Sequence, residues 1–119
     1  MSTPDPREMQ MTDNQEPMTV TTRPEGDTVV IALAGELDLH SSELLTSIVA
    51  EALDGAPQAI DIDADRLSFA DSAGLRALLS AREAAEQRDV RLRIVRVSAP
   101  LGRLLDMTGL REVFGAATG

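Results

Sequence analysis

Short apolar stretches typical of β-strands alternate with amphipathic stretches typical of helices over most of the 119 residues, and this order restricts the fold more than any other feature. Strand-like patterns cover residues 18–24, 28–35, 58–64, 90–97 and 111–114. Helical patterns separate all of these except the first two. Strands joined through a helix pair in parallel, whereas the turn at residues 25–27 makes the first pair antiparallel. The order β-β-α-β-α-β-α-β predicts one α/β domain, a small mixed β-sheet with helices packed on it.

The predicted helices have an apolar face and recognisable ends. The first places four apolar residues at i, i+3, i+4 and i+7, namely Leu45, Ile48, Val49 and Ala52. Gly55 ends this helix. The second is predicted over residues 72–88, and the third has Pro100 in its first turn and stops at Gly109.

Composition excludes several classes of chemistry. The chain has no cysteine, which excludes disulfides, thiolate nucleophiles and cysteine zinc sites. Every basic residue is arginine, so a Schiff-base lysine, the P-loop lysine and the Ser-x-x-Lys nucleophile pair are excluded as well. Two phenylalanines are the only aromatic residues, which leaves no platform for stacking nucleic acid bases.

The net charge and the distribution of apolar residues predict which partners and which compartment the protein has. A formal net charge of −9 repels phosphate backbones and anionic membranes, so we expect neither nucleic acid nor membrane partners. No apolar run approaches the ~20 residues of a membrane span, and no signal peptide is recognisable. We therefore expect a cytoplasmic protein. Residues 1–17 are polar without an apolar period, which predicts a disordered leader before a domain over residues 18–119.

Ser72, in the stretch ADSAG at residues 70–74, stands where a strand is predicted to pass into a helix. A serine at such a turn resembles the nucleophile of α/β-hydrolases. However, Ala70 replaces the first glycine of that motif, and the only histidine, His40, precedes the serine instead of following it. His40 also lacks a second nitrogen ligand for a metal site. We expect no enzymatic activity and no cofactor.

The acidic stretch DIDAD at residues 61–65 resembles the start of a calcium loop and the Asp-x-Asp loop of phosphatases. The calcium pattern needs glycine and glutamate where this chain has Arg66 and Ser72. The phosphatase and a phospho-receiver domain would each need a lysine, which the chain lacks. We interpret Asp61 and Asp63 as the solvent face of a strand.

Two roles for Ser72 remain open, a helix cap and a target of modification. Asp71 or Ser72 can cap the second helix, because both residue types accept hydrogen bonds from first-turn amides. A helix N-terminus also tolerates phosphate, and the small residues Ala73 and Gly74 leave the backbone uncovered, with Arg76 one turn further on. A phosphoryl group on Ser72 would keep the fold and add close to two negative charges to the surface.

Three stretches of the chain together resemble a known family. They are GELDLHSSELL at residues 35–45, DADRLSFADSAGLRALL at 63–79 and RLLDMTGLREVF at 103–114. In order and spacing they resemble the STAS-domain anti-sigma-factor antagonists, and the likeness runs from about Met18 to Phe114. The most specific element is F-x-D-S-x-G-L followed about thirty residues later by D-M-T-G-L.

This resemblance implies a single STAS domain that binds an anti-sigma factor when unphosphorylated and so releases a sigma factor for transcription. In that family the anti-sigma factor is a serine kinase of the histidine-kinase-like ATPase fold. It phosphorylates the serine after the aspartate, which ends binding, and a metal-dependent serine/threonine phosphatase reverses the modification. Carried over by motif, the phosphoacceptor is Ser72. The partner-binding residues expected around it are Asp38, Asp71, Ser72, Ala73, Gly74 and Arg76.

The chain departs from the family pattern directly after Ser72. Family members usually have Ser or Thr at this position, where this chain has Ala73, so the acceptor is unambiguous. The alternative to a switch is a non-switched STAS interaction module, a scaffold or transporter accessory in which Ser72 is only a helix cap.

Overall fold

The structure, a computed structural model, describes residues 17–116. Its elements are β1 (Thr19–Glu25), β2 (Thr28–Leu37), α2 (Leu39–Asp54), β3 (Ala59–Ala70), α3 (Ser72–Glu86), β4 (Arg91–Val97) and α4 (Ala99–Thr108). The strand order in the sheet is β1-β2-β3-β4, with β1 antiparallel to β2 and the other neighbours parallel. The predicted α/β fold with a small mixed sheet is confirmed. Residues 1–16 of the predicted leader lie outside the described residues.

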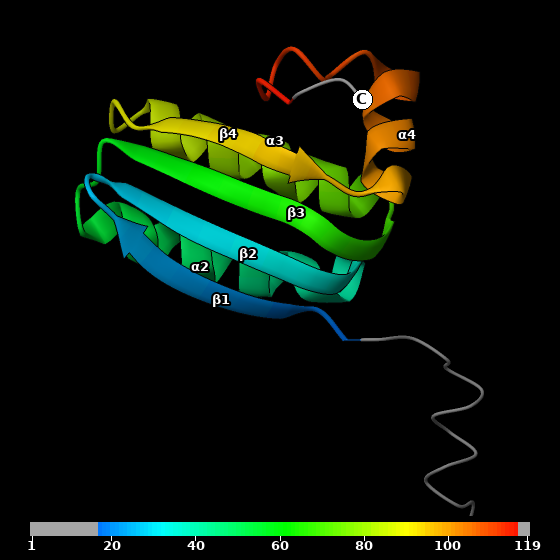
Figure 1. The fold of residues 1–119 in the computed structure, drawn as a ribbon, viewed down its shortest axis with the longest axis horizontal. Helices are drawn as coiled ribbons and strands as arrows, with labels where there is room; N and C mark the ends of the chain where they lie inside the picture. The colour runs from blue at the N-terminus through cyan, green and yellow to red at the C-terminus, as the bar shows by residue number, and fades with distance from the viewer. Residues whose placement is uncertain (1–16, 117–119) are drawn as a thin grey trace, which may run out of the picture.

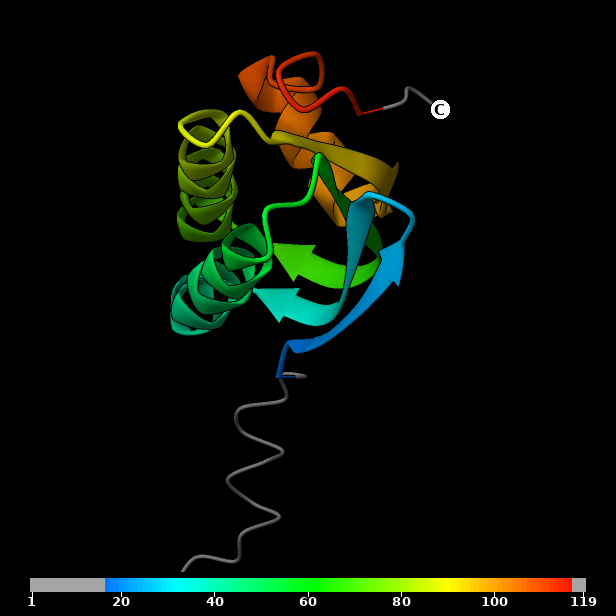
Figure 2. The ribbon, with the colours of Figure 1, turned by 90° about the vertical axis from the view of Figure 1, so that its left-hand side faces the viewer.

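Helices α2 and α3 lie side by side on one face of the sheet, and α4 stands apart from them beyond the end of β4 (Figure 1, Figure 2). The core fills the space between this face and the two helices, and Leu101 and Leu105 of α4 and Phe114 are buried in the same cluster. Fully buried side chains of this core include Ile31, Leu45, Ile60, Ile62 and Leu78. Burial of alternate strand residues and of one face of each helix therefore holds the two helices against the sheet.

Strand β3 is longer than predicted. The sequence pattern predicted residues 58–64, but β3 continues to Ala70 because its second half pairs with the end of β2. This pairing passes through two register shifts and places Leu37 opposite Ala70. The second half of β3 has no regular alternation of apolar and polar residues, so pairing with β2 decides its structure. As a result, β2 and β3 end at the same level.

The prediction of a strand over residues 111–114 is wrong. These residues form turns, because the carbonyl of Arg111 accepts hydrogen bonds from the amides of Phe114 and Ala116. The segment touches the sheet edge through a hydrogen bond of 3.0 Å from the Ile94 amide to the Phe114 carbonyl. The Phe114 side chain is buried, so packing holds the segment in place where a strand ladder was expected.

Asp61 and Asp63 lie on the sheet face opposite α2 and α3, and both bind arginines of β4. Arg93 Nε donates to Asp61 at 2.8 Å, and Arg96 Nη2 donates to Asp63 at 3.0 Å. Partial burial favours a higher pKa for Asp63, but the hydrogen bond and charge of Arg96 outweigh it and hold this pKa below its usual value. The two carboxylates lie on the solvent face of β3, as the interpretation of DIDAD predicted. Their ion pairs with Arg93 and Arg96, which join β3 to β4, were not predicted.

Gly74 lies in the first turn of α3, where this helix touches the end of β2. A Cβ atom at this position would lie 2.6 Å from the backbone oxygen of Leu37. Only a residue without a side chain lets α3 begin this close to the strand.

We expect Gly74→Ala to lower the free energy of unfolding by about 1–3 kcal/mol, because the added methyl group meets backbone that cannot move aside easily. Urea denaturation measures this loss. The matched control is Gly55→Ala, whose Cβ would lie an ordinary 3.6 Å from the Ala52 oxygen. Equal unfolding midpoints for the two variants would contradict the close contact.

Candidate functional site

The first turns of α2 and α3 lie next to each other at one end of the sheet, where the central strands β2 and β3 end. Leu37 and Ala70 end the parallel strands β2 and β3 and are paired with each other. A hydrogen bond of 3.2 Å from the Asp71 amide to the Leu37 carbonyl continues this pairing past the strand ends. Each of the two strands is followed by one aspartate and then by a helix, so Asp38 and Asp71 hold equivalent positions.

Both aspartates are helix N-caps. Asp71 Oδ1 accepts a hydrogen bond of 2.9 Å from the Gly74 amide, and Asp38 Oδ1 accepts one of 3.1 Å from the Ser41 amide. The hydroxyl of Ser41 accepts a hydrogen bond in return from the Asp38 amide at 2.8 Å, which completes a capping box. Sequence reasoning left open whether Asp71 or Ser72 caps α3, and the structure assigns the cap to Asp71.

Ser72 is the first residue of α3 and is exposed. Within residues 17–116, its hydroxyl makes no hydrogen bond. The neighbouring Asp71 is half-buried because its carboxylate is turned back toward the Gly74 amide. The serine hydroxyl is therefore free to react while the aspartate beside it keeps the helix start in place.

The remaining predicted residues lie in the same two helix turns. Gly74 is buried against Leu37, whereas Arg76 is exposed one turn beyond Ser72. The hydroxyl of Ser42 donates to the Asp38 carbonyl at 2.8 Å and lies 3.5 Å from the Ala73 carbonyl, which brings the first turns of α2 and α3 into contact. The structure thus brings together all six predicted residues: Asp38, Asp71, Ser72, Ala73, Gly74 and Arg76.

Two exposed apolar side chains at this end of the sheet were not predicted as site residues. Leu39 follows Asp38 and is 72% exposed, and Phe69 precedes Asp71 by two residues and is 41% exposed. Glu36, the cross-strand partner of Phe69, was also missed, and its Oε1 atom is buried without a hydrogen-bond partner in the described part of the chain. The stretches ELDL and LSFAD contain these residues but do not reveal which side chains stay exposed.

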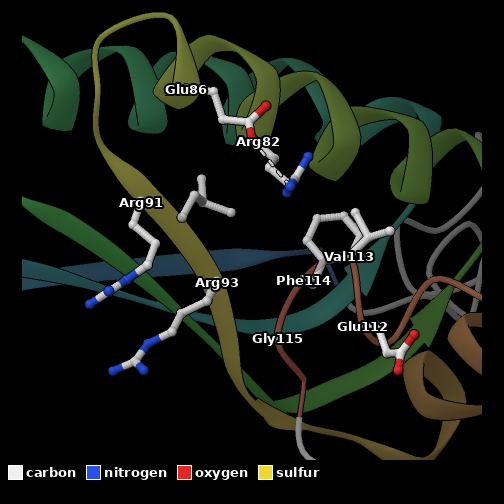
Figure 3. Close-up of a pocket in the computed structure, with 9 residues that line it drawn as sticks. Arg82, Glu86, Arg91, Arg93, Glu112, Val113, Phe114 and Gly115 are labelled. Atoms are coloured by element: carbon white, nitrogen blue, oxygen red, sulfur yellow. Dashed lines mark ion pairs between the residues drawn. The ribbon is translucent and has the colours of Figure 1, made fainter.

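A hollow of about 400 Å³ lies elsewhere, between α3, β4 and the segment that contains Phe114. Figure 3 shows Arg82 and Glu86 of α3 above it, joined by an ion pair of 3.1 Å, while Arg91 and Arg93 point away from them. Neither Ser72 nor a cap aspartate lines this hollow. The site at the helix starts is therefore separate from this hollow.

Within residues 17–116, no cluster of three or more His, Asp or Glu side chains is arranged to hold a metal ion. No helix in the same part of the chain is long and apolar enough to cross a membrane.

Comparison with known proteins identifies the family. The family profile described as "Mlab, STAS domain" matches residues 20–115. The chain belongs to the STAS domain family. The resemblance found in its motifs is thereby confirmed, and the match covers nearly the whole described domain.

Relatives of this STAS domain include anti-sigma factor antagonists. It is 31% identical to the anti-sigma F factor antagonist of Paenibacillus polymyxa over 71% of this chain and 74% of that protein. It resembles the anti-sigma factor antagonist SpoIIAA in its unphosphorylated form with a TM-score of 0.70, 28% identity and coverage of 84% and 89% of the two chains. The phosphorylated form of Bacillus SpoIIAA gives a TM-score of 0.65, 29% identity and coverage of 84% and 92%.

We expect Asp71→Ala to lower the free energy of unfolding by about 1 kcal/mol, because the Gly74 amide loses its acceptor. Asp71→Asn keeps an oxygen in the same place and should cost clearly less. Urea denaturation of both variants measures the difference. Equal losses for alanine and asparagine would show that the cap hydrogen bond contributes nothing.

Proposed function

We propose that this STAS domain is an anti-sigma-factor antagonist that is switched off by phosphorylation of Ser72. In its unphosphorylated form it binds an anti-sigma factor, which is a serine kinase, and so releases a sigma factor for transcription. The observation that carries the proposal is the exposed, unbonded hydroxyl of Ser72 at the first position of α3. The antagonist names of its relatives and the phosphorylated form of SpoIIAA support it.

The local geometry suits a phosphoacceptor. Because Asp71 already caps α3, the Ser72 hydroxyl can be modified without the loss of a hydrogen bond that holds the helix. A phosphate at a helix N-terminus is stabilised by the amides and the dipole of the first turn. It also adds about −1.5 to −2 charge next to the Asp71 carboxylate. The modification therefore changes the surface and keeps the fold.

The same observation weighs against the alternative of a non-switched module in which Ser72 is only a cap. Asp71 makes the capping hydrogen bond, which leaves Ser72 without that role. In our proposal the domain performs no catalysis itself and acts in the cytoplasm. Its partners are the kinase and a metal-dependent serine/threonine phosphatase that resets Ser72, and nucleic acid and membranes are not among them.

We expect wild type to form a complex with its anti-sigma kinase and to lose it when Mg-ATP is added. Ser72→Ala should bind equally well but keep the complex in Mg-ATP, because it cannot be phosphorylated. Ser72→Asp should fold normally and bind weakly without any ATP, since a negative side chain is favourable at a helix start but not at the interface. Size-exclusion chromatography of the mixtures measures complex formation.

The matched control is Ser80→Ala, which removes another exposed serine of α3 and should behave like wild type. Loss of the Ser72→Ala complex in Mg-ATP would place the switch at another residue, with Ser68 and Ser98 next to be tested. Unchanged affinity of Ser72→Asp would also contradict the proposed role of Ser72.

A further inference from the structure

Large apolar side chains with substantial exposure are few in the described domain, and two of them lie at the end of the sheet that carries Ser72. Among residues 17–116 the exposed large hydrophobic residues are Leu39, Leu44, Phe69, Met107 and Val113. Leu39 and Phe69 each lie within three residues of a cap aspartate in the sequence. Exposed apolar side chains that gather on one part of a surface are candidates for a contact surface.

Leu39 holds the same place in α2 that Ser72 holds in α3. Each is the first helical residue after a capping aspartate. The strand ends before them are paired at Leu37 and Ala70, and the Ser42 hydroxyl reaches the Ala73 carbonyl between the two first turns. The leucine and the serine therefore begin two adjacent helices, and the leucine side chain is 72% exposed.

Phe69 stands on the strand that leads to Ser72. It is paired with Glu36 across the parallel strands β2 and β3 and is 41% exposed. A phenylalanine offers more contact area than most side chains and loses little rotamer freedom when it is covered. Phe69 and Leu39 thus both lie at the end of the sheet that carries Ser72 and leave apolar surface exposed there.

We propose that Leu39 and Phe69 are the apolar anchors that bind the anti-sigma kinase, and that phosphate on Ser72 breaks this contact by bringing a solvated dianion to an apolar interface. This inference rests on the proposed function, because a kinase that modifies Ser72 must cover the surface immediately around it. The partner presents an apolar patch to the two side chains. Desolvation of the phosphate, with no change of fold, then ends the contact.

The proposal separates two roles on one surface. Leu39 and Phe69 provide affinity in the unphosphorylated state, because removing their apolar surface from water is favourable. Ser72 contributes little to affinity until it carries phosphate. Screening by salt weakens charge repulsion between exposed groups but does not restore solvent to a buried phosphate, so the phosphorylated protein should stay unbound at high salt.

The test compares affinities of Leu39→Ala and Phe69→Ala for the anti-sigma kinase, measured by isothermal titration calorimetry without ATP. We expect each variant to bind about tenfold more weakly or worse, which corresponds to about 1.4 kcal/mol. The control Met107→Ala removes an apolar side chain that is 82% exposed at the end of α4 and should bind like wild type. Leu39 is exposed enough that its replacement leaves the fold intact, and circular dichroism verifies this for each variant.

Each outcome decides between the two proposals. If wild type binds and the Leu39 and Phe69 variants bind equally well, the anchor inference is wrong while the proposed function stands. If wild type does not bind the kinase at all, the proposed function itself fails. If wild type sediments as a dimer and Leu39→Ala as a monomer, the patch serves self-association and the inference is wrong. Recovery of binding by the phosphorylated protein at high salt would overturn the desolvation mechanism.

Discussion

The parallel pairing of β2 with β3, continued to Leu37 and Ala70, is the constraint on which the rest of the site depends. Because both strands end at the same level, both following helices must start at the same end of the sheet. The hydrogen bond from the Asp71 amide to the Leu37 carbonyl and the close contact at Gly74 hold these starts in register. Ser72 is exposed in a fixed position because Asp71, before it, and Gly74, after it, both contact Leu37 at the end of β2.

Two adjacent residues at the start of α3, Asp71 and Ser72, have different roles. Asp71 satisfies an amide of the first turn of α3, and Ser72 is left free. If the serine were the cap, phosphorylation would alter the helix start, and the modification would act on stability as well as on binding. The observed arrangement separates the two effects, so a phosphate can change affinity while the domain stays folded.

Much of the fold and part of the site could be predicted from the sequence. The alternation of strand and helix patterns and the tight turn at residues 25–27 were sufficient for the mixed sheet, because local periodicity reflects which faces are buried. The second half of β3 was missed because its residues do not alternate, and only the partner strand makes it extended. The prediction of a strand over residues 111–114 failed for the opposite reason. This segment has a strand-like composition, but local turns supply its hydrogen bonds.

The site shows the same limit of sequence reasoning. The motif around Ser72 indicated a helix start, yet Asp71 and Ser72 are both good caps, and only the bond to Gly74 decides between them. In the sequence, Leu39 is one of many apolar residues in a predicted helix. Its exposure depends on how α2 lies against the sheet, which the sequence does not show. Contacts between distant parts of the chain decide such features, and single-sequence patterns do not contain them.

The proposed switch requires that Ser72 is the one residue that the kinase modifies. The decisive measurement is intact-mass spectrometry of wild type and Ser72→Ala after incubation with the anti-sigma kinase and Mg-ATP, followed by mapping of the modified peptide. We predict one phosphoryl group on wild type, located on Ser72, and none on the variant. A phosphoryl group on the Ser72→Ala protein, or an unmodified wild type in the presence of a kinase that binds it, would contradict the account.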